Sequence, residues 1–202
     1  MGFLKRTYNG RINKKMNKTL RLLMFSDIFV LSGFGLIAPI LAIFIKDNLI
    51  GGTILAAGIA SMIFLITHSV LQLIFAYKFN PKDRIWMLWL GTGLIALVPF
   101  GYIFAKTIYH IYAIQFVYGV GAAFAYPSWA SLFTANLEKG KRGFQWSIYS
   151  SSVGIGTAIT AGVGAWLADK IGFQLVFVLT GILAVVGLLI LLKLEKKILK
   201  KT

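Results

Sequence analysis

Long apolar segments alternate with short polar ones along the whole chain. Each apolar segment reaches or exceeds the roughly 20 residues that a helix needs to cross a hydrocarbon core of about 30 Å. Apolar and polar positions do not alternate within them, which favours helices over the strands of a membrane β-barrel. The pattern therefore predicts an all-α integral membrane protein with six transmembrane helices. The segments run over residues 22–45, 52–77, 85–105, 108–137, 143–168 and 172–194.

Most of the charge lies in the polar stretches between these segments. The formal net charge is +15 and the mean hydropathy is +0.80, although only 13% of the residues are charged. We interpret residues 1–21 and 195–202 as basic cytoplasmic tails and residues 22–194 as the six-helix transmembrane bundle. Separated basic clusters between apolar segments are the pattern of membrane topology. We therefore expect the lipid bilayer as a partner, and no nucleic acid.

The basic clusters also predict an orientation. All but three of the 21 lysines and arginines lie in the two tails or in the second and fourth loops, and the three exceptions are Lys46, Lys106 and Lys170. Basic loops stay in the cytoplasm, so both termini are expected there. An even number of spans independently requires both ends on one side. We predict a multi-pass protein of the plasma (inner) membrane.

Two similar stretches open the first and second sets of three spans. GFGLIAPIL runs from Gly33 to Leu41, and GVGAAFAYP runs from Gly119 to Pro127. Apolar segments interrupted by glycine or proline at corresponding positions of two repeats are typical of secondary transporters built as inverted repeats. The pair predicts a 3+3 inverted repeat, with chance similarity as the alternative, since Gly and Pro are common in membrane helices.

Asp27 is the only acid inside a predicted span. A carboxylate within the bilayer is costly and usually marks a functional site. One interpretation is a proton or cation site that faces the cytoplasm. The other is a partner at the membrane interface for a basic residue, namely Arg21, Arg84 or Arg142.

His68 lies in the middle of the second span, on the predicted face of Ser61, Leu65 and Gln72. A neutral imidazole could hydrogen-bond a solute or move a proton, whereas the alternative is a packing histidine. Asp27 and His68 are thus the candidates for coupling to an ion. With two distant histidines and no cysteine, we expect no metal site, no cofactor and no disulfide.

The fourth and fifth spans carry the remaining candidates for a solute site. Polar and aromatic side chains share one face of the fourth span, and a further tyrosine begins the fifth. Such faces line ligand pockets, although aromatic packing and interface anchoring are the alternatives. The predicted solute-binding residues are Gln115, Tyr118, Tyr126, Trp129 and Tyr149, with His68 and Gln72 from the second span.

Small residues recur every fourth position on the fifth span, at Ser152, Gly156, Thr160 and Gly164. In lipid, such a stripe marks close packing between helices. It has two interpretations: packing within this bundle, or contact with a partner.

In the order and spacing of these features, residues 20 to 194 resemble one half of a major facilitator superfamily transporter, nearest to the amino half of its drug–proton antiporter branch. GFGLIAPIL, the Pro-containing fourth span and the segment GAWLADKIGF (Gly164 to Phe173) carry the resemblance. It implies a solute path between two six-helix halves, with helices two and five meeting the other half. We therefore assign the small stripe to a dimer interface.

The sequence departs from the family pattern at several positions. In the loop AYKFNPKDR (Ala76 to Arg84), only Arg84 matches the family's signature, with Asn80 at its aspartate and Asp83 at its second glycine. Gln115 stands where the family often has an arginine, and Thr160-Ala161 stands at the Gly-Pro of the antiporter motif. These departures weaken the case for proton-coupled drug export.

The leading hypothesis is a half-size secondary transporter of a small organic solute, acting as a homodimer by alternating access. The alternatives are half of a hetero-oligomeric transporter, a fragment of a longer one, and a non-transporting accessory or scaffold subunit. An enzyme is not expected, because the sequence has neither a Gly-x-Ser-Gly turn nor an intramembrane aspartate pair.

Overall fold

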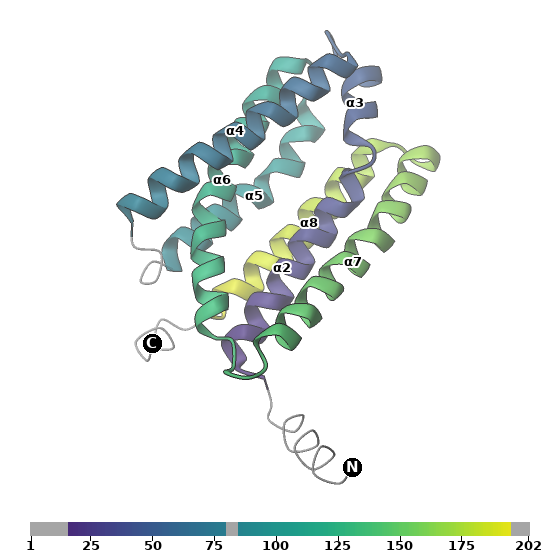
Figure 1. Cartoon of the computed structure of the whole chain (residues 1–202). Coiled ribbons are helices and arrows are strands. Elements are labelled where there is room, and N and C mark those ends of the chain that lie inside the picture. Colours follow the sequence, from purple (N-terminus) through teal and green to yellow (C-terminus); the bar gives the residue numbers. More distant parts are fainter. Residues whose placement is uncertain (1–15, 80–84, 195–202) are drawn as a thin grey trace.

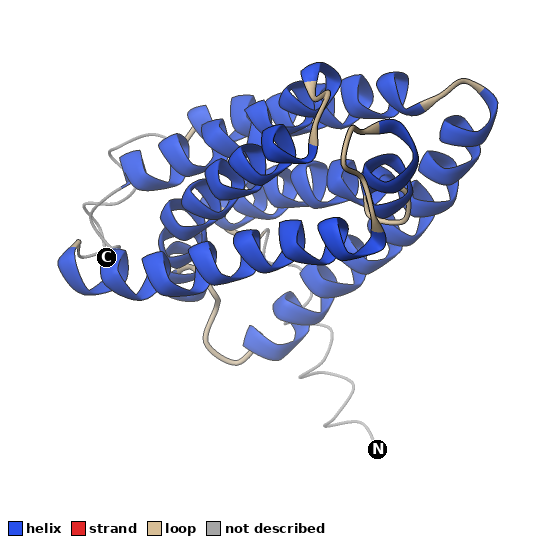
Figure 2. Cartoon of the chain, turned by 90° about the horizontal axis from the view of Figure 1, so that it is seen from above, coloured by secondary structure: helices blue, strands red, loops and turns tan. Residues whose placement is uncertain are grey.

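The computed structural model describes residues 16–79 and 85–194. Most of both predicted tails, and the part of the signature loop from Asn80 to Arg84, lie outside the described residues. Every regular element in the described part is a helix (Figures 1 and 2). The helices are α2 (Lys18–Ile37), α3 (Leu41–Asn48), α4 (Ile54–Lys78), α5 (Ile85–Phe104), α6 (Ile108–Ala135), α7 (Arg142–Lys170) and α8 (Phe173–Leu192).

Six of these helices, all except α3, are long and apolar enough to cross a membrane. Apart from the end of α2, their bounds lie within a few residues of the predicted segments, so the prediction of an all-α, six-span protein is confirmed. Local capping fixes two of the starts. The Asn17 side chain accepts a hydrogen bond from the Thr19 amide at 3.1 Å, and the Thr53 hydroxyl accepts one from the Ala56 amide at 2.9 Å.

The first apolar segment, residues 22–45, is not one continuous helix as predicted. Helix α2 begins earlier, at Lys18 inside the predicted tail, and ends at Ile37. A turn at residues 38–40 separates it from α3. Pro39 explains the break, because it has no amide hydrogen to donate and its ring clashes with the carbonyl four residues earlier. Pro99 and Pro127, in contrast, stay inside α5 and α6.

The helices pack as two groups of three. Helix α2 packs against α7 and α8, α6 packs against α4 and α5, and the contact of α5 with α8 joins the groups (Figure 1). If α2, α4 and α5 are exchanged with α6, α7 and α8 in that order, the same pairs of helices remain in contact. A 3+3 inverted repeat would produce this arrangement. The repeat itself stays a prediction that the packing favours.

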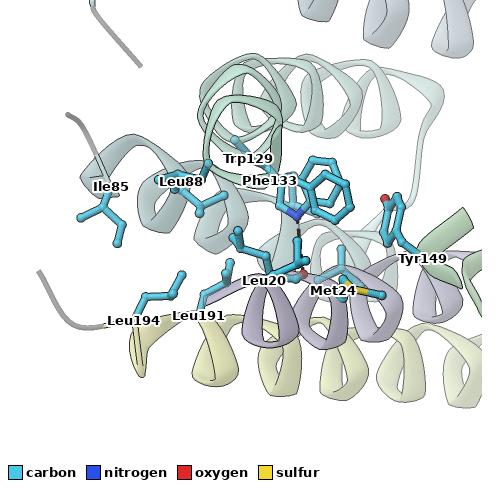
Figure 3. Packing of buried hydrophobic residues seen from close by; sticks show 14 residues of the cluster. Leu20, Met24, Ile85, Leu88, Trp129, Phe133, Tyr149, Leu191 and Leu194 are labelled. Atoms are coloured by element: carbon cyan, nitrogen blue, oxygen red, sulfur yellow. Dashed lines mark hydrogen bonds between the residues drawn. The ribbon is translucent and has the colours of Figure 1, made fainter. Parts of the chain in front are cut away.

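A buried hydrophobic cluster fills each end of the bundle. The cluster at one end includes Leu20, Leu23, Leu88 and Leu191, and Figure 3 shows Trp129 and Phe133 lying over α2 there. The other includes Ile37, Phe44, Tyr102, Ile111 and Phe177. We call the first the basic end, because the described lysines and arginines other than Lys46, Lys106 and Lys170 lie there.

Glycines bring neighbouring helices into backbone contact. A Cβ atom built on Gly164 of α7 would overlap the backbone carbonyl oxygen of Leu36 in α2. A Cβ atom on Gly91 of α5 would likewise overlap the backbone of α6 at Gly121 and Ala125. Because lipid provides no hydrophobic drive for helices to associate, close contacts of this kind hold a membrane bundle together.

This packing predicts different effects for two glycines of α7. Gly164→Ala should destabilise the protein by about 1–3 kcal/mol, because the added methyl group meets the α2 backbone. Gly143→Ala is the matched control, since nothing lies within 4 Å of a Cβ atom at that position. The control should be neutral or more stable by up to ~1 kcal/mol, from helix propensity. Thermal unfolding in one detergent would compare them, and equal midpoints would contradict the packing.

Candidate functional site

A cavity lies inside the bundle between α2 and α6. Each of these two helices packs against two other helices of its group. This central cavity has a volume of about 230 Å³. Six helices contribute to its wall, and most of its lining is apolar or aromatic. The residues that line it with polar or aromatic side chains are Ser26, Asp27, Phe64, His68, Thr92, Tyr118, Tyr126, Trp129 and Tyr149.

Among the described residues that line the cavity, Asp27 contributes the only carboxylate. The Tyr149 hydroxyl of α7 donates a hydrogen bond to its Oδ2 atom. The ion pairs of the described residues involve other acids, namely Asp47, Glu138 and Asp169. Asp27 is therefore not paired with Arg21 or Arg142, and Arg84 lies outside the described residues. Asp27 instead lines the cavity, and its role as a cation site stays a prediction.

Tyr118 of α6 forms the centre of an aromatic stack beside the cavity. Its ring lies 4.9 Å from that of Phe34 and 4.2 Å from that of Phe64, with both pairs nearly parallel. Stacked rings of this kind hold one another in a single orientation. Tyr118 thus offers the cavity a fixed aromatic surface.

His68 and Tyr126 meet in the same cavity. Their ring centroids are 6.0 Å apart in an edge-to-face arrangement, and the His68 ring also stacks on Phe64. The Nε2 atom of His68 is buried and has no hydrogen-bond partner among the described residues. Tyr126 is 57% exposed and so keeps much of its side chain free. Both side chains are thus placed to contact a molecule in the cavity.

Trp129 closes the cavity towards the basic end. Its indole Nε1 atom donates to the backbone carbonyl of Leu23 at 3.5 Å, which links α6 to α2 (Figure 3). Its ring lies 4.9 Å from the ring of Tyr149. Trp129 therefore supports both the cavity wall and the Asp27–Tyr149 pair.

Two predicted residues do not reach the cavity wall. Gln115 is 4% exposed and is buried within the bundle, where its Oε1 atom has no partner among the described residues. Gln72 interacts with His68 but is not part of the lining. Both share a helical face with lining residues, but Gln115 lies about one turn before Tyr118 on α6 and Gln72 lies one turn after His68 on α4, beyond the described lining. Their role in binding solute stays a prediction.

The small stripe of α7 packs within the chain. A Cβ atom built on Gly156 would overlap the hydroxyl group of Ser32 in α2. The Thr160 hydroxyl group lies where a Cβ atom on Gly35 of α2 would be, and Gly164 meets the α2 backbone. Gly156, Thr160 and Gly164 therefore serve the contact of α7 with α2. This corrects their assignment to a dimer interface and matches the other interpretation. Ser152, the first residue of the stripe, lines a second groove.

Two aromatic residues beside the predicted ones were not identified from the sequence. Phe64 lines the cavity one turn before His68 on α4, and Phe34 of α2 stacks on Tyr118 without being part of the lining. The i−4 spacing from His68 could have identified Phe64, whereas Leu65, which was grouped with His68, is exposed. No sequence signal pairs Phe34 with Tyr118, because the two residues are distant in the chain.

The wall combines one carboxylate, one imidazole and several aromatic faces. Such surfaces bind amphipathic organic molecules, and the aromatic faces and the carboxylate also accept a cation. Among the described residues, no three histidine, aspartate or glutamate side chains come together to hold a metal ion.

The chain is similar to transporters from distant organisms. It is 25% identical over 188 residues to an uncharacterized MFS-type transporter of Methanocaldococcus jannaschii, which covers 93% of this chain and 48% of the relative. It is 27% identical over 173 residues to the multi-drug resistance efflux pump PmrA of Streptococcus pneumoniae, covering 84% and 42%. A voltage-gated purine nucleotide uniporter of Rattus norvegicus is 28% identical over 92 residues, covering 46% and 18%.

The chain thus spans about half the length of the first two relatives. The family model of the Major Facilitator Superfamily matches residues 23–202, which is nearly the whole chain. Together with six membrane-spanning helices around a central cavity, this match shows that the chain belongs to the Major Facilitator Superfamily of membrane transporters.

Proposed function

We propose that this chain is one half of a secondary transporter and carries half of the solute site in its central cavity. The observation that supports this most is the convergence of Asp27, Tyr118 and Tyr149 from three helices on one cavity in a bundle that belongs to a transporter family. Transporters of this kind bind solute near the membrane midplane between two halves.

The solute class we propose is amphipathic and aromatic, with cations included. Aromatic walls bind flat apolar surfaces, and a cation gains from both the aromatic faces and the Asp27 carboxylate. The relative in Streptococcus pneumoniae is described as a multi-drug resistance efflux pump, which is consistent with such a class. Asp27 and His68 remain our candidates for coupling to a proton or another cation.

We propose a second copy of the chain as the other half, so that the two alternate access to the site. The side of α7 that faces away from α2 carries a further row of small residues at Gly154, Ala158 and Gly162. Nothing lies within 4 Å of a Cβ atom at either glycine, so these positions are open to a neighbour. Small residues at four-residue spacing allow another helix to approach closely.

We place the basic end, and with it both termini, in the cytoplasm, and the protein in the plasma (inner) membrane. Basic residues beside spans are retained on the cytoplasmic side. The described residues at this end include Lys18, Arg21, Lys78 and Arg142, whereas Lys46 and Lys170 lie at the other end.

The second candidate is an accessory or scaffold subunit, or one half of a hetero-oligomeric transporter. The observation in its favour is the altered signature loop, with Asn80 and Asp83 in place of the family's aspartate and glycine. Such a subunit would be inactive when purified alone.

Reconstitution of the purified chain tests the proposal. Proteoliposomes that enclose DNA should take up ethidium, an aromatic cation, faster than liposomes without protein, with the dye's fluorescence as the measurement. Replacing both Tyr118 and Tyr126 by alanine should slow uptake about tenfold or more, because each aromatic contact contributes about 0.5–1.5 kcal/mol.

The matched control replaces Tyr109 and Tyr112, which lie outside the cavity lining on the same helix, by alanine. This control should transport at the normal rate. Because Tyr118 stacks on two rings, thermal unfolding of each variant should accompany the flux assay. Equal rates in both double variants would contradict the proposed site, and no uptake by the parent protein would favour the accessory subunit.

The charge of Asp27 has a separate, testable effect. Asp27→Asn keeps the size of the side chain and an acceptor for Tyr149 but removes the negative charge. Because opposite unit charges about 4 Å apart attract by about 1–4 kcal/mol between water and a protein surface, ethidium uptake should fall by roughly tenfold or more. Asp47→Asn, at the end of α3 and paired with Lys46, is the control and should leave uptake unchanged. An equal loss in both variants would show that Asp27 does not act on the solute.

A further inference from the structure

A second groove opens between α2 and α7 at the basic end of the bundle. Its volume is about 360 Å³, and none of its lining residues belongs to the wall of the central cavity. Most of its lining is apolar, with a single cation. The lining residues are Met16, Arg21, Met24, Phe25, Ile28, Ile148 and Ser152.

The groove exists because α7 touches α2 closely along only part of its length. At Gly156 and Gly164, α7 lies directly against α2. Four residues before Gly156, the stripe continues at Ser152, which instead lines the groove together with Ile148. Towards the basic end, the surface between the two helices is therefore an apolar groove and not a close glycine contact.

Arg21 supplies a free positive charge at the end of this space. It lies in the first turns of α2, is exposed, and forms no ion pair with any acid of the described residues. Glu138, the other acid at this end of the described structure, pairs with Lys141 at 3.6 Å, and Asp27 accepts from Tyr149. A guanidinium group offers five N–H donors in a planar fork that matches a phosphate.

We propose that this groove binds one anionic phospholipid, with the phosphate on Arg21 and an acyl chain along Phe25, Ile28 and Ile148. Phe25 is 51% exposed, so its ring is available to an acyl chain. A basic residue at the end of a span lies at the level of the lipid headgroups, where it attracts anionic lipid. The proposal stands apart from the proposed transport function, since it concerns other residues.

Charge complementarity favours a lipid over other occupants. Residues 1–15, which precede Met16 in the chain, contain basic residues and no acid, so their charge is repelled by Arg21. A free phosphate ion would satisfy Arg21 but leave the apolar wall of Phe25, Ile28 and Ile148 uncovered. A phospholipid satisfies both parts of the groove at once.

The lipid would also join α2 and α7 next to the central cavity. Ile28 follows Asp27 on α2, and Ile148 precedes Tyr149 on α7. An acyl chain between the two isoleucines therefore contacts both helices beside the Asp27–Tyr149 hydrogen bond. Occupancy of the groove is expected to hold the two helices at their present separation.

Native mass spectrometry of the full chain in detergent tests the proposal. Dioleoyl phosphatidylglycerol and dioleoyl phosphatidylcholine, which share their acyl chains, would be added at equal concentration. One phosphatidylglycerol should be retained in preference to phosphatidylcholine. Arg21→Gln should reduce that retention about fivefold, and Arg21→Lys should restore most of it. Lys78→Gln is the matched control, since it removes a cation of the same end outside the groove, and should change retention less than twofold.

Ser152→Trp fills the groove from α7 without changing its charge. It should reduce phosphatidylglycerol retention as well, while thermal unfolding checks that the variant is folded. Equal retention of the two lipids by the parent protein, or equal losses in Arg21→Gln and Lys78→Gln, would overturn the proposal. Complete displacement of the lipid by millimolar glycerol phosphate would identify a simple anion site. Loss of the lipid on dimerisation would identify a protein interface, and either result also overturns it.

Discussion

Backbone contact between helices is the feature on which the rest of this structure depends. In a bilayer, association of helices relies on van der Waals packing and not on the exclusion of water. Gly164 lets α7 meet α2, and Gly91 lets α5 meet α6. Helices α2 and α6 are each held by two neighbours and touch each other at only a few points, which leaves the central cavity between them. The position of the cavity therefore follows from where the chain has glycine.

The Asp27–Tyr149 hydrogen bond connects this packing to the proposed function. A carboxylate within a span needs a partner or water, and here it has a hydroxyl donor and a cavity. The hydrogen bond joins α2 to α7, the same pair of helices that Gly164 brings together. A cation that binds Asp27 would compete with Tyr149 for the carboxylate oxygen. Binding in the cavity would therefore act directly on the contact between these two helices.

The sequence predicted the six spans well, because length and hydropathy alone decide what can cross a bilayer. The break at Pro39 was not predicted, because a proline does not always end a membrane helix. Pro99 and Pro127, for example, lie inside α5 and α6. For the site, Asp27 and His68 were identifiable as rare polar residues in apolar segments. Gln115 shares the lining face of α6 but lies about one turn beyond the cavity, because periodicity gives a face but not how far a cavity extends along it. Periodicity also does not give the helix opposite a face, and here the stripe of Gly156 and Gly164 meets α2 of the same chain. The stack of Phe34 on Tyr118 depends on tertiary packing that no local pattern contains.

The central claim is that one chain supplies half of a solute path and requires a second copy of itself to complete that path. The most direct measurement is the mass of the purified protein in lipid nanodiscs, made on the same preparation that transports ethidium in proteoliposomes. The account predicts a species of twice the 22.3 kDa chain mass, with transport lost when the protein is diluted to one chain per vesicle. A single chain that transports ethidium at the full rate would contradict it.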